Sequence, residues 1–132
     1  MRHLVTLSED ECWQHLAGAE VCRLAFLADG RIEIIPVNYA PRGKRLMLGS
    51  RPGSIVSRAI GGPVTLEVDG WTDDAAWSVV VRGPLRPIPE DDERAPVHAW
   101  AFPATEITRL EVLPIEVQGR RFIRDADAFA ST

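Results

Sequence analysis

Two neighbouring stretches carry side chains that could contact a flat, polar ligand with an anionic end. The first is Pro36-Val37-Asn38-Tyr39, whose backbone and side-chain groups could donate and accept hydrogen bonds. The second is Ser50-Arg51-Pro52-Gly53-Ser54, where an expected strand gives way to a turn and a helix start. Such a turn can hold an anion on its backbone N–H groups, although most turns of this kind only reverse the chain. Both stretches are therefore candidate binding residues.

Two arginines, Arg51 and Arg58, flank the short helix that we expect over 54–60. One interpretation is that they face an anion held at the start of this helix. The other is that they are solvated surface side chains. The pattern favours neither interpretation, so both stay open.

The cysteines and histidines predict neither a metal site nor a redox pair. Cys12 and Cys22 lack C-x-x-C spacing and are expected to be buried thiols in a reducing compartment. His3, His15 and His98 are scattered, and no H-E-x-x-H or Cys/His ligand spacing is present. A metal hydrolase or nuclease is therefore a poor match, and the chain also shows no serine-nucleophile motif and no Walker-type loop.

The candidate residues must be positioned by a strand-rich fold. Hydrophobic alternation and turn residues predict strands over 21–28, 31–40, 45–50, 63–68, 77–86 and 105–117, the last interrupted at Pro114. Helices are predicted over 8–17, which begins with the capping-box residues Ser8 and Glu11, and over 54–60. A short helix or an irregular acidic segment is expected from 89 to 100. Asp29-Gly30 predicts a tight hairpin, and Gly83-Pro84 predicts a bulge or bend.

Six strands with small helices at their margins suggest a closed or nearly closed antiparallel barrel. We expect one domain over 1–123 and a polar tail over 124–132. The net charge of −4 argues against non-specific nucleic-acid binding. No apolar run approaches the roughly 20 residues of a membrane helix. The N-terminus lacks the apolar core of a signal peptide, which favours a cytoplasmic location.

Several stretches occur together in an order that is typical of one family. They are Ser8–Trp13, Val21–Ala25, Ile35–Tyr39, Pro63–Gly70, Trp77–Gly83, Ile107-Thr108 and Gly119–Phe122. On these residues the chain resembles the pyridoxamine-phosphate-oxidase-like flavin-binding split-barrel family. The likeness is to its short bacterial branch, which includes nitroimidazole-reductase-like proteins.

The resemblance implies a mainly β fold, a six-stranded split barrel that forms a homodimer, with flavin mononucleotide (FMN) bound at the dimer interface. The isoalloxazine ring would lie along Pro36, Val37, Asn38 and Tyr39. The phosphate would lie near Ser50, Arg51 and Ser54, with Arg58 as a further cation. Trp77 would pack near the ring or act as a hydrophobic residue at the barrel end or interface. Tyr39 and Arg120 are the candidates for substrate contact.

The implied function is an FMN-dependent oxidoreductase acting on a small molecule, in which the flavin carries the redox chemistry. No side chain stands out as an acid–base catalyst. The alternative is a non-catalytic carrier or sensor on the same barrel, holding a flavin, a deazaflavin, haem or another planar ligand.

The chain departs from the family pattern at the phosphate positions. Relatives commonly carry an arginine where this chain has Gly49 and a lysine where it has Ile55. A hydrogen bond to a charged group contributes roughly 1.5–3 kcal/mol. Lacking both would lower affinity by about 10² to 10⁴. Arg51 and Arg58 are the candidates to replace that charge.

Overall fold

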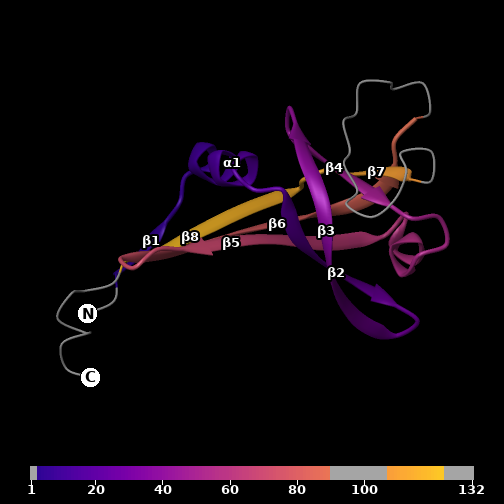
Figure 1. The fold of residues 1–132 in the computed structure, drawn as a ribbon, viewed down its shortest axis with the longest axis horizontal. Helices are drawn as coiled ribbons and strands as arrows, with labels where there is room; N and C mark the ends of the chain where they lie inside the picture. The colour runs from indigo at the N-terminus through magenta and orange to yellow at the C-terminus, as the bar shows by residue number, and fades with distance from the viewer. Residues whose placement is uncertain (1–2, 90–106, 124–132) are drawn as a thin grey trace.

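The computed structural model describes residues 3–89 and 107–123. Its strands are β1 (His3–Thr6), β2 (Val21–Ala28), β3 (Arg31–Arg42), β4 (Arg45–Ser50), β5 (Pro63–Trp71), β6 (Ala75–Pro87), β7 (Thr108–Val112) and β8 (Glu116–Ile123) (Figure 1). The helix α1 spans Glu9–Ala17, and a 3-10 helix spans Ile55–Ala59. Most of the predicted acidic segment after residue 89, with His98, and the predicted tail over 124–132 lie outside the described residues.

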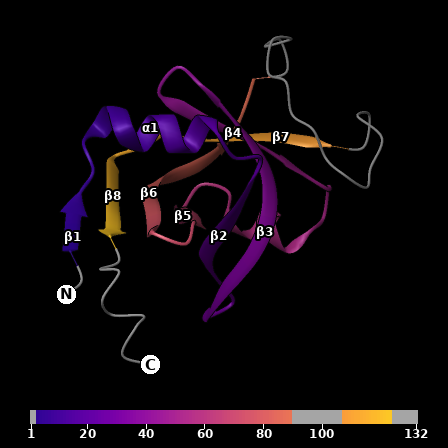
Figure 2. The same ribbon diagram turned by 60° about the vertical axis from the view of Figure 1, so that its left-hand side comes forward.

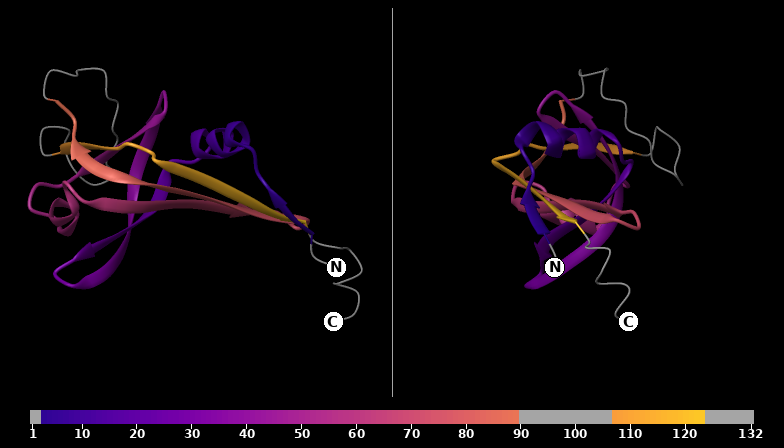
Figure 3. Two further views of the ribbon diagram at one scale, coloured as in Figure 1. Left: turned by 180° about the vertical axis from the view of Figure 1, so that it is seen from behind. Right: turned by 90° about the vertical axis from the view of Figure 1, so that its left-hand side faces the viewer.

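Six antiparallel strands close into a barrel, which confirms the predicted fold class. The order is β6-β5-β2-β3-β4-β7, and β7 pairs back to β6. The end-on view in Figure 3 shows this ring of strands. Beyond the barrel, β8 pairs with β6, and β1 pairs with β8, so one wall of the barrel continues into a longer sheet. The barrel interior is filled by apolar side chains, among them Leu24, Leu66 and Val81.

The predicted sixth strand over 105–117 is in fact two strands, β7 and β8, separated by a turn around Pro114. The division follows from the pairing with β6, which bonds β8 along Ala75–Arg82 and β7 along Leu85–Pro87. β6 changes partner at Gly83-Pro84, where the sequence predicts a bend. β1 is also absent from the predicted strands.

Gly83 allows the turn between β7 and β8 to pass close to β6. A Cβ atom placed at Gly83 would lie 2.0 Å from the carbonyl oxygen of Leu113. The N–H of Leu113 donates to the carbonyl of Pro84 at 3.2 Å, and the N–H of Ile115 donates to the carbonyl of Arg82 at 2.8 Å. No side chain fits between these two backbones, so this crossing requires glycine.

Local sequence signals account for the hairpin and for α1. Asp29 and Gly30 both have positive φ, 53° and 77°, as a type I′ turn requires. Ser8 caps α1, and its hydroxyl accepts from the N–H of Glu11 in the predicted capping box. Cys12 on α1 is buried, and a Cβ at Gly119 of β8 would lie 2.6 Å from its sulfur, so α1 packs closely on β8 (Figure 2).

Both cysteines are buried free thiols, as predicted. Burial raises the pKa of Cys22 to about 12, and burial also raises the pKa of Cys12. Neither thiol is therefore a reactive thiolate at neutral pH. Among the described residues, no helix is long and apolar enough to cross a membrane.

Candidate functional site

The candidate site begins where β3 changes neighbours. From Arg31 to Asn38, β3 pairs with β2 on one edge. From Tyr39 to Arg42 it pairs with β4 on the other edge. Over 31–38 no described strand pairs with that second edge, because β4 leaves β3 beyond the pair Tyr39–Leu48. The backbone groups pointing from this open edge are available to a ligand.

The predicted ring-binding residues alternate between two sides of β3. Pro36 is exposed, and the half-buried Asn38 has its side-chain amide 3.5 Å from the carbonyl oxygen of Glu20. Val37 packs against the barrel core. Thus the side chains of Pro36 and Asn38 face outward, whereas the side chain of Val37 packs against the core. Val37 pairs with Cys22, so its backbone groups point to β2 and not to the open edge.

Tyr39 is a core residue whose side chain has little exposed surface, and its role as a substrate contact stays a prediction. Its side chain is 5% exposed, and its hydroxyl donates to the carbonyl of Leu16 at 2.5 Å. Its backbone N–H donates to the carbonyl of Glu20 at 3.0 Å. Burial raises the pKa of Tyr39 further above its ordinary value, so the phenol stays protonated. Arg120, the other predicted contact, is exposed on β8.

The predicted phosphate residues Ser50 and Ser54 come together at the end of β4. Their hydroxyl oxygens lie 2.7 Å apart, and Ser50 is only 8% exposed. The hydroxyl of Ser50 also donates to the carbonyl of Arg51 at 3.3 Å. Ser54 stands at the N-cap position of the 3-10 helix but makes no capping hydrogen bond with its side chain. The structure therefore forms a compact hydroxyl pair beside the exposed Arg51.

The helix after this turn differs from the predicted one. It is a five-residue 3-10 helix, too short to add much dipole to an anion site. Arg58 does not face the serine pair, because its guanidinium forms an ion pair with Asp29 in the β2–β3 turn. Both partners are exposed, so this ion pair contributes little to stability. Ile55, at the position of the family lysine, packs against the core.

Trp77 packs against α1. Its ring stacks on His15, with ring centroids 3.9 Å apart and planes inclined by 20°. A Cβ at Gly70, its neighbour on β5, would lie 2.8 Å from the indole. Trp77 therefore packs against α1 and the core, and both of its predicted roles stay predictions.

A charged cluster that the sequence interpretation missed lies beside Pro36. Arg23 pairs with Pro36 across β2 and β3, and its guanidinium contacts Glu67 at 2.9 Å and Asp69 at 2.6 Å. Burial raises the pKa of Glu67, helped by its hydrogen bond with Asp69, while Arg23 acts in the opposite direction. The alternation of acidic residues along β5 could have indicated this cluster.

The outer face of the sheet β1-β8-β6-β5-β2-β3 carries exposed apolar side chains. Six of them follow the strand alternation onto this face: Leu4, Leu27, Ile32, Ile34, Trp71 and Phe122. At one end a groove of about 690 Å³ is lined by Leu27, Ile32, Pro84 and Ile115, among others. Three basic and three acidic residues lie between the apolar ends of the face: Arg23, Arg82, Arg120, Glu67, Asp69 and Glu116.

Comparison with known proteins identifies the family. The family model of pyridoxamine 5'-phosphate oxidase matches residues 8–121. An uncharacterized protein of Rhizobium meliloti (strain 1021) is 31% identical over 100 residues, and the match spans 73% of this chain and 66% of that protein's length.

Two solved structures share the fold. The FAD binding protein from Mycobacterium smegmatis is 29% identical with a TM-score of 0.74, covering 91% of this chain and 99% of that one. An FAD-binding protein from Mesorhizobium loti is 25% identical with a TM-score of 0.76, covering 89% and 97%. The chain therefore belongs to the pyridoxamine 5'-phosphate oxidase family and has the split-barrel fold of its flavin-binding members, as its sequence predicted.

Proposed function

We propose that this chain binds a flavin, FMN in our interpretation, in the split between β3 and β4 and acts as a flavin-dependent oxidoreductase of a small molecule. One observation carries the proposal: β3 and β4 separate beyond the pair Tyr39–Leu48, which leaves the edge of β3 over 31–38 without a strand neighbour. The hydroxyl pair of Ser50 and Ser54 lies at the end of β4, on the other side of this separation. Two relatives that share the fold are named as FAD-binding proteins, which supports a flavin.

The residues present fit such a group. The open strand edge offers the polar edge of an isoalloxazine ring the carbonyl of Pro36 as an acceptor and the N–H and carbonyl of Asn38 as a donor and an acceptor. The hydroxyls of Ser50 and Ser54, next to Arg51, suit a phosphate. When bound, the flavin supplies the electron-accepting and electron-donating chemistry, and the chain supplies binding and orientation.

A homodimer is part of the proposal, with the partner copy completing the site. The outer face supports it, because exposed large apolar side chains gather at both of its ends, where a partner copy could cover them. The six charged residues between its apolar ends are balanced in sign, so two copies can meet without net repulsion.

The test is a titration of the purified protein with FMN, FAD and riboflavin, followed by flavin fluorescence. We expect saturable quenching at micromolar flavin, in a species whose sedimentation mass equals two 14.6 kDa chains. Protein that leaves the fluorescence of all three flavins unchanged would contradict the proposal.

The second candidate, a carrier or sensor of a planar ligand, is favoured by the absence of a cation at Gly49 and Ile55. Reoxidation of the dithionite-reduced, flavin-loaded protein by a quinone separates the two functions. An oxidoreductase should transfer electrons faster than free reduced flavin does. A carrier should slow that transfer, because it shields the ring.

A further inference from the structure

The two apolar ends of the outer face are placed symmetrically along β5. At one end of this strand Trp71 is 78% exposed. At the other end Pro63 lines the groove of about 690 Å³. Glu67 stands midway between them, and all three side chains share the outer face because successive side chains of a strand alternate. The face therefore has a natural centre at Glu67.

The two ends differ in shape in a way that suits them to each other. The groove is a hollow with an apolar lining, and Ile115 at its rim is 83% exposed. Trp71 is a large exposed side chain next to the turn that joins β5 to β6. Figure 1 shows β5 and β8 continuing past the barrel toward this end. A second copy turned end for end would bring its own tryptophan to the groove.

A two-fold dimer uses the same patch on both copies, so one axis must satisfy both ends at once. An axis that lies between the copies and crosses the strands at Glu67 reverses the strand direction and sets each strand over its own copy. Sheets packed face to face keep their strands within about 30° of each other. The central row carries both signs, because Arg23 contacts Glu67 at 2.9 Å, so it can face its own copy without net repulsion.

The charges on β8 favour the same register. The central row continues from Glu67 through Val80 to Gln118 of β8. Glu116 and Arg120 stand on either side of Gln118 on the outer face. The end-for-end register would therefore set Glu116 opposite the partner's Arg120, twice in each dimer. Within the described part of the chain Arg120 makes no ion pair, so its charge is available to a partner.

We propose that two copies of this chain pair end for end through their outer faces, in the register centred on Glu67. In this dimer Trp71 fills the partner's groove, and Glu116 pairs with the partner's Arg120. The apolar ends and the charges lead to this register by separate routes, which is electrostatic and shape complementarity of the kind that specifies an interface. The inference rests on the homodimer of the proposed function and assigns its geometry.

The same register gives the partner copy a place at the open edge of β3. Pro36 pairs with Arg23, so it belongs to the central row, and Ile34 and Asn38 lie on either side of it. Asn38 therefore faces the partner's Ile34. An apolar side chain there covers the outward side of the strand edge that we assign to the flavin ring, so each copy contributes to the other's site.

Sedimentation equilibrium of charge variants tests the register. Arg120→Glu should raise the dissociation constant of the dimer by about 10-fold or more, because it sets two carboxylates opposite each other at both contacts. Lys44→Glu is the matched control. It makes the same change in net charge at an exposed residue of the turn between β3 and β4, outside the outer face, and it should leave the constant unchanged.

The charge exchange Glu116→Arg/Arg120→Glu should restore most of the affinity, because the two signs again face each other across the axis. An axis running along the strands would set β8 over β2 instead, and the exchange would then be as weak as Arg120→Glu alone, which would overturn the inference. Trp71→Ala should also weaken the dimer by about 10-fold or more, since a large aromatic contact is lost. An unchanged constant for Trp71→Ala would likewise overturn it.

The flavin titration keeps this inference separate from the proposed function. Wild-type protein that sediments as a monomer with and without FMN overturns the dimer, and quenching of flavin fluorescence by that monomer would leave flavin binding standing. A dimer that responds to the variants as expected but quenches no flavin would support the register and contradict the proposed function.

Discussion

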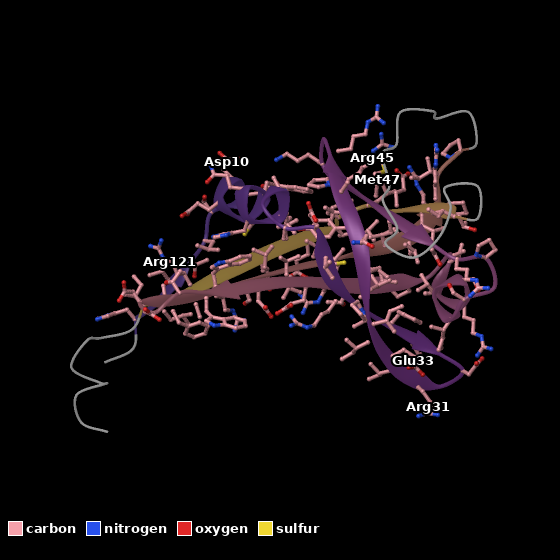
Figure 4. All side chains as sticks on the ribbon, viewed as in Figure 1. Asp10, Arg31, Glu33, Arg45, Met47 and Arg121 are labelled. Atoms are coloured by element: carbon pink, nitrogen blue, oxygen red, sulfur yellow. The ribbon has the colours of Figure 1, made fainter. Side chains whose placement is uncertain are left out.

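Replacing both arginines that hold Glu111, in an Arg45→Ala/Arg86→Ala variant, is expected to lower the free energy of unfolding by about 3–5 kcal/mol. The carboxylate of Glu111 is 0% exposed, and Arg45 and Arg86 are its two partners at 3.1 and 2.7 Å. Arg45 and Met47 lie on the same side of β4 (Figure 4), and Met47 is as fully buried as Glu111. Without the arginines, a charge stays buried beside apolar atoms with neither of these partners. Urea denaturation measures the loss.

A matched variant separates the pairing from the packing. Arg45→Met/Arg86→Met/Glu111→Leu removes all three charges together and keeps apolar bulk at each position. Replacing a whole buried ionic group in this way is often neutral or stabilising. We therefore expect this triple variant to be at least as stable as wild type. A double alanine variant that is as stable as wild type would show that Glu111 does not depend on its arginines.

The second large effect is expected at Gly83. Gly83→Ala should cost about 3 kcal/mol, the upper end of the range for overpacked positions, because the new Cβ would lie 2.0 Å from the backbone oxygen of Leu113. A backbone atom cannot rotate away as a side chain can, so either β6 or the turn between β7 and β8 must move. Thermal unfolding should show the midpoint falling by about 8 °C or more.

Gly62→Ala is the control for the loss of a glycine near the same strand. Its Cβ would meet the carbonyl of Ala59 at 3.6 Å, which is ordinary contact. We expect a change within about 0.5 kcal/mol, as for most surface substitutions. If the two variants unfold at the same temperature, the close crossing at Gly83 is not what holds β6 to the turn around Pro114.

Those parts of the fold that depend on local residues could be predicted from the sequence. The hairpin at Asp29-Gly30 needs two residues with positive φ, and the start of α1 needs Ser8 and Glu11 three positions apart. Both signals lie within four residues, so no tertiary knowledge is required. The alternation in β2 and β5 likewise predicts which side chains fill the barrel.

The errors concern contacts between distant segments. The division of the last predicted strand depends on where β6 changes partner, and Pro114 alone shows an interruption but not a new strand. β1 has four residues and is defined by its pairing with β8, more than 100 residues away in the chain. Arg58 binds Asp29 across two elements, so its own neighbours in the sequence do not indicate that partner.

The candidate site was predicted only in part, because some of its residues are positioned by contacts between distant segments. Ser50, Arg51 and Ser54 are close in sequence and do meet in space. The inward direction of Tyr39 depends on the pairing of β3 with β2 and β4, because the strand contains apolar residues on both faces.

The central claim is that a flavin binds between the open edge of β3 and the end of β4. Amide ¹H–¹⁵N chemical shifts recorded during a titration with FMN test it residue by residue. We expect the largest changes within Ile32–Asn38 and within Gly49–Ser54. Changes confined to the groove beside Leu27 and Ile115, with those two segments unaffected at saturation, would contradict the account.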